Sequence, residues 1–383
     1  MITTINNKHK KLNVPNLRFP EFQGEWHLCK ISNILRIGNG RDYKHLAKGN
    51  IPVFGTGGYM TSVNDYLYDG ETTFIGRKGT INKPYYYKGK FWTVDTLFYT
   101  HSFDGIMPHF VYCLFQTINW LKYNEASGVP SLSKDTIEKI KVHIPQIKEQ
   151  QKISRLILLL DERIATQNKI IDKLQSLIKG LNDFLYTQYG GEVLTSFAEL
   201  GTSYSGLSGK SAQDFGSGKP FITYLNVYSN NVIKENDFQY VAIKDDEKQN
   251  VVKYGDVLFT LSSETPEEVG VGSVYLGKEK VYLNSFCFGI HITNTEVAFP
   301  PYLSYYVSLT AFRKFIYPYA QGSTRFNLCK ADFEKASIKL PTLADQKRIY
   351  SVLGHIDCKI ETERQMLNLY NSQKQYLLRQ MFI

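Results

Sequence analysis

The sequence is poor in cysteine and has no long apolar run, and both absences narrow what the chain can be. Its 383 residues include five cysteines, which are scattered and never spaced as Cys-x-x-Cys. This usage is typical of a reducing cytoplasm and argues against structural disulfides and zinc sites. No stretch of about 18 apolar residues could cross a membrane, and the basic N-terminal segment lacks the apolar core of a secretion signal. We therefore expect a cytoplasmic protein with no membrane partner.

Catalytic and cofactor-binding motifs are also missing. The segment Ser208–Ser211 resembles a phosphate-binding loop, but Tyr204 stands where that motif needs its first glycine. The run Phe54–Gly58 resembles a dinucleotide or methyl-donor loop, but Met60 replaces the last glycine. The eight histidines form no His-Glu-x-x-His motif. We therefore predict no catalytic residue, no metal site and no cofactor bound by this chain.

Positive charge and aromatic residues are what the chain has in excess. The 45 Lys and Arg residues against 36 Asp and Glu residues give a net charge of +9, which favours an anionic partner. Residues 1–143 carry +7 and residues 191–339 carry −2, so the charge is not uniform. The 27 tyrosines and 23 phenylalanines suit both β-sheet cores and contacts with nucleic-acid bases. The negative second half is an objection to DNA binding there, unless its base-reading face alone is basic.

An internal repeat organises the chain. The segment IPQIKEQQKISRLILLLDERI at 144–164 aligns without gaps to LPTLADQKRIYSVLGHIDCKI at 340–360, at an offset of 196 residues. Further upstream, PHFVYCLF at 108–115 parallels PYLSYYVS at 301–308, at an offset of 193. A drifting offset is what loop insertions produce. The chain is therefore predicted to be two copies of a unit made of one domain and one helix.

Each repeated segment begins a helix that carries a coiled-coil pattern. A proline precedes each helix and an acidic residue lies in its first turn, where the helix dipole favours negative charge. Apolar residues then recur at steps of four and three, which predicts that the two helices pair, and the tandem layout predicts that they run antiparallel as a spacer. The open alternative is that each helix packs only on its own domain. The predicted seam is Ile153, Ile157, Leu160, Ile164, Ile171, Leu174, Ile178, Leu181, Ile349, Leu353, Ile356, Ile360, Leu367 and Leu377.

These features divide the chain into four segments. We predict a first domain over 1–143 with an N-terminal arm at 1–16, a central spacer helix over 144–190, a second domain over 191–339 and a C-terminal spacer helix over 340–383. The predicted fold class is α+β: two tandem β-rich domains with helices, separated by two long helices that pair as an antiparallel coiled coil, in a pseudo-twofold internal repeat.

Within the domains, β-branched and aromatic runs punctuated by glycine predict strands, and amphipathic runs predict helices. Strands are expected at 51–60, 72–76, 83–87, 91–99, 219–227, 256–261 and 273–277. Helices are expected at 108–123 and 300–316.

Glycine-rich loops with polar and aromatic side chains are the candidates for DNA binding. Arginine can bond guanine bidentately, asparagine can bond adenine, and lysine can bond phosphate. Any one loop could equally be a surface turn, but together they indicate a DNA-binding surface. The first-domain candidates are Asn39, Arg41, Lys44, Thr56, Tyr59, Arg77, Lys78, Lys83, Tyr85 and Tyr86. The second-domain candidates are Ser203, Tyr204, Ser205, Lys210, Tyr224, Asn226, Ser262, Ser263, Thr265 and Arg325.

Motifs along the whole chain carry a family resemblance. They are PNLRFPEFQGEW at 15–26, IGRKGT at 75–80, SGVPSL at 127–132, GLSGKS at 206–211, YLNV at 224–227, GDV at 255–257 and LPTLADQ at 340–346. On these residues the chain closely resembles the specificity subunit of type I restriction-modification enzymes. The match departs at Asp345, where the family usually has glutamate, a change that we expect to alter little chemically.

The resemblance implies a division of labour between this chain and its partners. Each domain would be a target-recognition domain that reads one half of a bipartite, asymmetric site in double-stranded DNA. The paired helices would set the gap and dock two methyltransferase subunits, which use S-adenosylmethionine to methylate adenine N6. Restriction subunits would add translocation and cleavage driven by ATP with magnesium. The chain itself would be non-catalytic and bind no cofactor.

Two other classes stay open. A fused restriction-methylation enzyme would need the methyl-donor motifs that are absent. A non-catalytic coiled-coil adaptor, a scaffold without DNA reading, is harder to exclude. Binding to duplex DNA that falls steeply with salt would separate a DNA reader from such an adaptor.

Overall fold

The computed structural model describes residues 13–383, which divide into two compact units. Among these residues, unit 1 comprises 13–169 and 365–383, and unit 2 comprises 170–364. Most of the N-terminal arm predicted at 1–16 lies outside the described residues.

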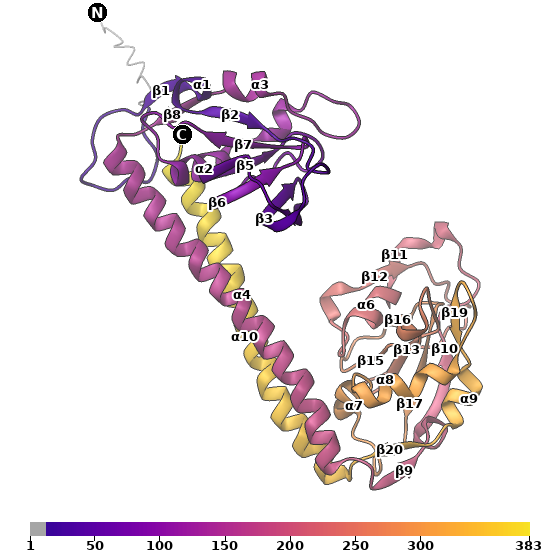
Figure 1. The fold of residues 1–383 in the computed structure, drawn as a ribbon. Helices are drawn as coiled ribbons and strands as arrows, with labels where there is room; N and C mark the ends of the chain where they lie inside the picture. The colour runs from indigo at the N-terminus through magenta and orange to yellow at the C-terminus, as the bar shows by residue number, and fades with distance from the viewer. Residues whose placement is uncertain (1–12) are drawn as a thin grey trace, which may run out of the picture. The chain divides into compact units, whose positions relative to one another are not determined.

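Two long helices contribute to both units. They are α4 (Ile147–Tyr189) and α10 (Leu343–Met381), shown in Figure 1. Pro145 and Pro341 precede them, as expected for residues that lack an N–H donor and favour the start of a helix. In residues 13–383, no helix is both long enough and apolar enough to cross a membrane.

Unit 1 is built on a six-stranded sheet in the order β2-β7-β5-β6-β3-β4, with β3 and β6 parallel and the other neighbours antiparallel. The strands are β2 (Arg36–Asn39), β3 (Lys48–Gly55), β4 (Gly58–Val63), β5 (Tyr68–Gly76), β6 (Tyr85–Thr93) and β7 (Leu97–His101). A separate pair joins β1 (His27–Lys30) to β8 (Lys141–Ile144). The helices are α1 (Ile31–Ile34), α2 (Pro108–Thr117) and α3 (Lys134–Lys139), with a 3-10 turn at Trp120–Tyr123. The run expected as one strand at 91–99 is divided by a turn between β6 and β7.

Unit 2 has several smaller sheets, in the orders β10-β17-β13-β15, β12-β11-β16, β14-β19-β18 and β20-β9. The strands are β9 (Val193–Thr195), β10 (Gly201–Ser205), β11 (Phe215–Ile222), β12 (Gln239–Val241), β13 (Val257–Thr260), β14 (Ser262–Ser263), β15 (Gly272–Val274), β16 (Tyr282–Leu283), β17 (Cys287–Ile292), β18 (Ala320–Gln321), β19 (Phe326–Leu328) and β20 (Ile338–Leu340). The α-helices are α5 (Phe197–Leu200), α6 (Tyr224–Ser229), α7 (Pro300–Tyr306), α8 (Thr310–Ile316) and α9 (Lys330–Lys335).

The strand predicted at 219–227 is only half right. β11 ends at Ile222, and the chain continues as helix α6. The reason is a capping box, in which the Thr223 hydroxyl accepts from the Asn226 N–H while the Asn226 side chain accepts from the Thr223 N–H. These two bonds satisfy donors that the first turn of a helix leaves free.

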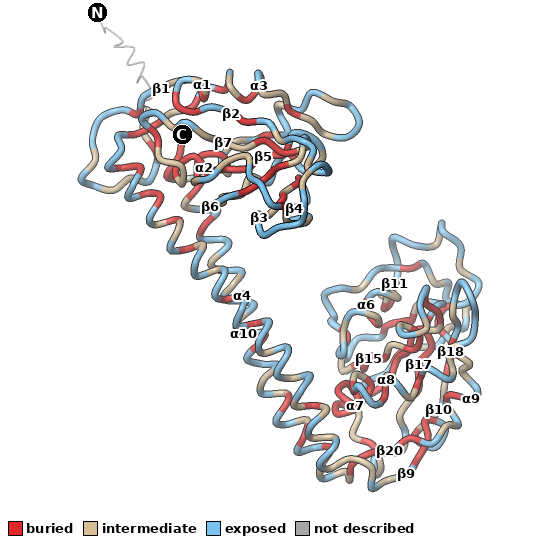
Figure 2. The backbone as a smooth tube through the Cα atoms, in the orientation of Figure 1, coloured by how far each residue is buried: buried red, intermediate tan, exposed pale blue. Residues whose placement is uncertain are grey.

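The long helices pack together within each unit. In unit 1, Ile153 and Ile157 of α4 lie in one apolar cluster with Leu378 of α10. In unit 2, Ile178 of α4 packs against the cluster that holds Ile349 of α10. The start of each helix therefore meets the end of the other, which is an antiparallel arrangement. All fourteen residues of the predicted seam are buried or half-buried. Along both long helices, buried and half-buried stretches alternate with exposed ones (Figure 2).

The predicted fold class is confirmed, because two α+β domains stand in tandem and the two long helices pack together. The alternative in which each helix packs only on its own domain is wrong. The apolar clusters nevertheless join the helices to the domains as well as to each other.

A buried glutamine at the start of each long helix forms the same set of hydrogen bonds in both copies of the repeat. The Gln150 side-chain amide donates to the carbonyls of Gly105 (3.0 Å) and Pro145 (2.9 Å), and its oxygen accepts from the Met107 N–H (2.9 Å). These bonds tie the first turn of α4 to the residue that precedes α2.

The second glutamine lies 196 residues further on and does the same. Gln346 donates to the carbonyls of Val297 (2.7 Å) and Pro341 (3.0 Å) and accepts from the Phe299 N–H (2.8 Å). It thereby ties α10 to the residue that precedes α7. Both glutamines are fully buried.

The N-terminal motif at 15–26 fastens the ends of both long helices in unit 1. The Arg18 guanidinium donates to both carboxylate oxygens of the buried Glu149, each at 2.8 Å. The Leu17 N–H donates to the Gln380 carbonyl of α10 (2.8 Å). The Trp26 ring meets Phe382 edge-on. The motif is therefore a structural clasp.

The acidic residue in the first turn of each long helix makes different contacts in the two copies of the repeat. Glu149 reaches Arg18 in a distant segment. Asp345, one methylene shorter, accepts from the Thr342 hydroxyl at 2.7 Å and so makes a local cap.

We predict that Gln150→Ala destabilises unit 1, because it leaves the Met107 N–H and two carbonyls without partners in a buried place. Each unsatisfied buried group costs about 1–3 kcal/mol, so the free energy of unfolding should fall by at least that amount. All three tryptophans, Trp26, Trp92 and Trp120, lie in unit 1, and their fluorescence during urea unfolding reports on it alone.

The matched control is Gln151→Ala, the same change at the adjacent, exposed position of α4. It should leave the urea midpoint unchanged. Equal midpoints for the two variants would show that the Gln150 bonds contribute nothing.

Candidate nucleic-acid interface

In unit 1 the loop that follows β5 is held by backbone hydrogen bonds to the turn between β6 and β7 and to the loop before α3. The Arg77 N–H donates to the Thr96 carbonyl (2.8 Å), and the Arg77 carbonyl accepts from the Leu132 N–H (2.9 Å). The Gly79 N–H donates to the Pro130 carbonyl (2.8 Å). Gly79 has a φ of 87°, which glycine adopts without strain. Two candidate cations, Arg77 and Lys78, therefore stand on a fixed loop.

Unit 2 repeats this arrangement. The Leu261 N–H donates to the Phe286 carbonyl (2.8 Å), and the Leu261 carbonyl accepts from the Leu328 N–H (2.8 Å). Leu328 follows Leu132 by 196 residues, which is the offset of the helical repeat. The loop after β13 is thus equivalent to the loop after β5.

A hollow lies beside each of these loops, and we name them the first and the second hollow. The first is lined by Asn39, Arg77, Lys78, Phe98, Glu125, Ser131, Leu132, Ser133 and Lys134. The second is lined by Tyr224, Leu225, Tyr228, Ser262, Ser263, Glu264, Glu268, Phe286, Thr324 and Arg325. Seven of the predicted DNA-binding residues line these hollows: Asn39, Arg77 and Lys78 line the first, and Tyr224, Ser262, Ser263 and Arg325 line the second.

The first hollow is cationic. The guanidinium carbon of Arg77 lies 6.0 Å from the centre of the Phe98 ring. Hydrogen bonds from the Thr136 and Ser133 hydroxyls hold the pKa of Glu125 below its usual value. Because that carboxylate is occupied by its own loop, the exposed cations dominate what the hollow presents to a ligand.

The second hollow is aromatic and carries both signs of charge. Tyr224 and Tyr228 stack with ring centres 6.0 Å apart, and the Tyr224 hydroxyl donates to the Ser262 carbonyl (2.8 Å). The Arg325 guanidinium carbon lies 5.7 Å from the ring centre of Phe286, which is 54% exposed. An exposed ring beside an arginine is suited to stacking and hydrogen bonding with bases.

Other predicted contacts lie outside the hollows. Lys83, Arg41 and Lys44 are exposed in loops, Thr56 and Tyr59 lie at the β3–β4 hairpin, Ser203 and Ser205 lie on β10, and Thr265 lies in the loop after β14. Lys210 is paired with Glu247 at 2.5 Å, and Tyr85 and Tyr86 are half-buried on β6.

Tyr204 and Asn226, which the sequence indicated as DNA contacts, are buried and engaged in contacts within unit 2. Tyr204 is 8% exposed, its hydroxyl donates to Asp256 (2.7 Å), and its ring stacks on His291 with centres 4.2 Å apart. Burial raises the pKa of the Tyr204 hydroxyl. Asn226 is buried and occupied in the capping box of α6.

Several lining residues were missed by sequence reasoning. Lys134 follows the SGVPSL motif by two residues, and that proximity was the available signal. Tyr228 lies one helical turn after Tyr224, a spacing that would have paired them. Phe286 and Glu268 gave no such signal. In residues 13–383, no three His, Cys, Asp or Glu side chains lie close enough to hold a metal ion.

Comparison with known proteins decides the family. The family model of the type I restriction modification DNA specificity domain matches residues 23–176 and again residues 200–369. The chain belongs to the family of type I restriction-modification specificity subunits. The resemblance drawn from its sequence motifs is thereby confirmed.

Two relatives match this specificity subunit along most of their length. It is 26% identical over 343 residues to a protein assigned as the MjaX specificity subunit of a type I restriction enzyme from Methanocaldococcus jannaschii, covering 80% of this chain and 74% of that one. It is 22% identical over 351 residues to a protein assigned as the specificity subunit S.HindORF215P of Haemophilus influenzae, covering 86% of both.

The fold is shared with solved structures. The crystal structure of the type I S subunit from M. genitalium aligns with a TM-score of 0.60 at 12% identity, over 97% of this chain and 99% of that one. A chain from a structural study of complex assembly in a type I system aligns with a TM-score of 0.55 at 14% identity, over 92% and 96%.

We predict that Arg77→Ala with Lys78→Ala weakens binding to duplex DNA and makes its salt dependence shallower. Each lost phosphate contact reduces the slope of log affinity against log salt by about one. The measurement is affinity for cognate and random duplexes at several salt concentrations.

The control pair is Lys30→Ala with Lys141→Ala, which removes the same charge from the β1–β8 pair, where the two residues are Cα partners. It should leave the slope nearly unchanged. Unaltered affinity and site choice in the Arg77/Lys78 variant would remove this loop from the interface.

Proposed function

We propose that this specificity subunit directs a type I restriction-modification complex to a bipartite, asymmetric DNA site. Each domain reads one half of the site through its hollow and the neighbouring loops, and the chain itself catalyses no reaction. The observation that carries the proposal is the repeat of one loop arrangement with different side chains. Arg77 and Lys78 in the first domain correspond to Leu261 and Ser262 in the second. Equivalent positions with different chemistry suit two different half-sites.

The paired helices would set the gap between the half-sites. Support comes from the way each domain is fixed: Gln150 and Gln346 bind the helix starts to the domains, and the helix ends join the same apolar clusters. A domain fixed to both helices of its unit cannot swing independently of them. A constant gap would follow.

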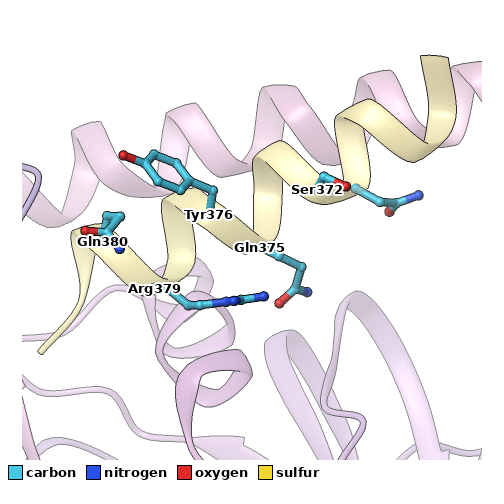
Figure 3. Close-up of a pocket in the computed structure, with 6 residues that line it drawn as sticks. Ser372, Gln375, Tyr376, Arg379 and Gln380 are labelled. Carbon is cyan, nitrogen blue, oxygen red and sulfur yellow. The ribbon is translucent and has the colours of Figure 1, made fainter. Parts of the chain in front are cut away.

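The outer faces of the helices would dock two methyltransferase subunits. Leu369 and Tyr376, seven residues apart on α10, are 64% and 58% exposed. Gln375 and Arg379, one turn apart, extend from another side of the same helix (Figure 3). Apolar side chains exposed at a heptad spacing, beside polar groups, are suited to binding a partner helix.

Cofactors would belong to the partners. The methyltransferase subunits would bind S-adenosylmethionine and methylate adenine N6, and restriction subunits would use ATP with magnesium. Such a complex would act on DNA in the cytoplasm, in agreement with the five free cysteines. The coiled-coil adaptor without DNA reading is not favoured, because both domains match the DNA specificity model.

We predict that lengthening the helix pair changes the gap and leaves the half-sites intact. Four residues inserted after Gln167, matched by four after Glu363 at the equivalent position of α10, add about 6 Å at 1.5 Å per residue. The gap should therefore grow by about one to two base pairs of 3.4 Å each. The measurement is modified-base sequencing of DNA from cells that also make the cognate methyltransferase subunit.

Cells that lack either protein are the controls. A methylated-adenine motif that depends on both proteins, with the same two halves and a longer gap in the variant, is the expected outcome. Altered half-sites with an unchanged gap would contradict the spacer role. A wild-type chain that forms a stable complex but yields no new motif would contradict DNA reading itself.

A further inference from the structure

The two acidic side chains of the second hollow are in different situations. Glu268 is occupied, because its two carboxylate oxygens accept from the hydroxyls of Tyr228 (2.7 Å) and Ser263 (3.0 Å). These bonds hold the pKa of Glu268 below its usual value. Glu264 lies two residues after the start of β14 and is exposed. Among the described residues it forms no ion pair, and the neighbouring Arg325 forms none either.

A free carboxylate is unusual on a surface that faces DNA, because phosphate repels it. The favourable partner it can find there is an exocyclic amino group on a base edge, cytosine N4 or adenine N6 in the major groove. Arg325 supplies the complementary group, since guanidinium bonds guanine or phosphate. One donor and one acceptor beside the exposed Phe286 ring are suited to reading bases.

The position of Glu264 supports this role. Leu261 of the second domain is equivalent to Arg77 of the first, so Glu264 is equivalent to Thr80. Its loop is anchored by β14 pairing with β19, in which Ser262 faces Asn327 and Ser263 faces Phe326. Glu268 fixes the same loop from the other side through Ser263. The exposed carboxylate therefore extends from a rigid platform.

We propose that Glu264 is a specificity-determining residue of the second domain, whose carboxylate accepts a hydrogen bond from the amino group of a cytosine or an adenine in one half-site. This inference rests on the proposed function. It is also compatible with a recognition domain whose net charge is −2, because this acid acts on a base edge and not on phosphates.

The test is Glu264→Ala in the full chain, made together with its cognate methyltransferase subunit, with the methylated motif read by modified-base sequencing. The expected result is relaxed choice at a single base pair of one half-site, with discrimination there falling on the order of tenfold. The other half-site and the gap should not change. Glu264→Gln keeps an acceptor oxygen and loses only the charge, so it should relax the same position less than Glu264→Ala does.

The matched control is Glu296→Ala, which removes the same charge at an exposed position of unit 2 outside the hollow. It should leave the motif unchanged. An unchanged motif in both Glu264 variants, or the same relaxation in Glu296→Ala, would overturn the assignment.

A second measurement identifies the amino group. Duplexes carry purine in place of adenine, or 2-pyrimidinone in place of cytosine, at the relaxed position, so that the amino group alone is lost. The wild-type complex should bind the duplex that lacks the amino group about tenfold more weakly than the unmodified duplex. The Glu264→Ala complex should bind both duplexes equally. Equal losses in both complexes would overturn the contact. Absence of any bipartite motif with the wild-type chain would instead be a failure of the proposed function.

Discussion

The apolar core of each recognition domain includes side chains from both long helices of its unit, and the rest of the structure depends on this shared core. In unit 1, Ile153 at the start of α4 and Met381 at the end of α10 lie in one cluster with Trp26. In unit 2, Leu353 of α10 lies in the main cluster and Leu181 of α4 packs against it. Because interiors are close-packed, a domain cannot shift on its helices without opening cavities. This packing therefore fixes the positions of the loops that line the hollows.

Polar residues in the helix seam fix the register in which α4 and α10 pack against each other. Lys374 of α10 is buried and paired with Asp161 of α4 at 2.6 Å. In the other copy Asp357, the equivalent of Asp161, accepts from the Tyr305 hydroxyl, because Ile178 stands where the lysine would be. A buried charge is costly unless it is paired, so a slipped helix pair would leave Asp161 or Lys374 alone. The seam is thereby specified by polar contacts as well as by apolar spacing.

Features that depend on local periodicity were predictable from the sequence. The fourteen predicted seam residues follow a repeat of seven in the sequence, and all of them are buried or half-buried. The paired offsets likewise predicted two equivalent domains. None of this required knowledge of contacts between distant segments.

The hollows could be foreseen only in part, because they are made by segments that meet through tertiary pairing. The loop after β13 faces Arg325 only because β14 pairs with β19, more than sixty residues along the chain. The same limit explains Tyr204. A tyrosine in a polar, glycine-rich run reads as an exposed contact, but Gly289 on the adjacent strand leaves a space that the Tyr204 ring fills. Side-chain type does not reveal which face of a strand is covered.

The two domains differ in net charge, and this difference is compatible with binding to one DNA duplex because both domains belong to the same chain. Phosphate contacts provide most of the affinity that is independent of sequence, and residues 1–143 with a charge of +7 can supply them. Once that domain is bound, the second is held at a high effective concentration near the same duplex. It then needs little phosphate affinity of its own, and its surface can carry acceptors for base amino groups at a smaller cost in affinity than in an isolated domain. The negative charge of the second domain is in this view a consequence of tandem construction.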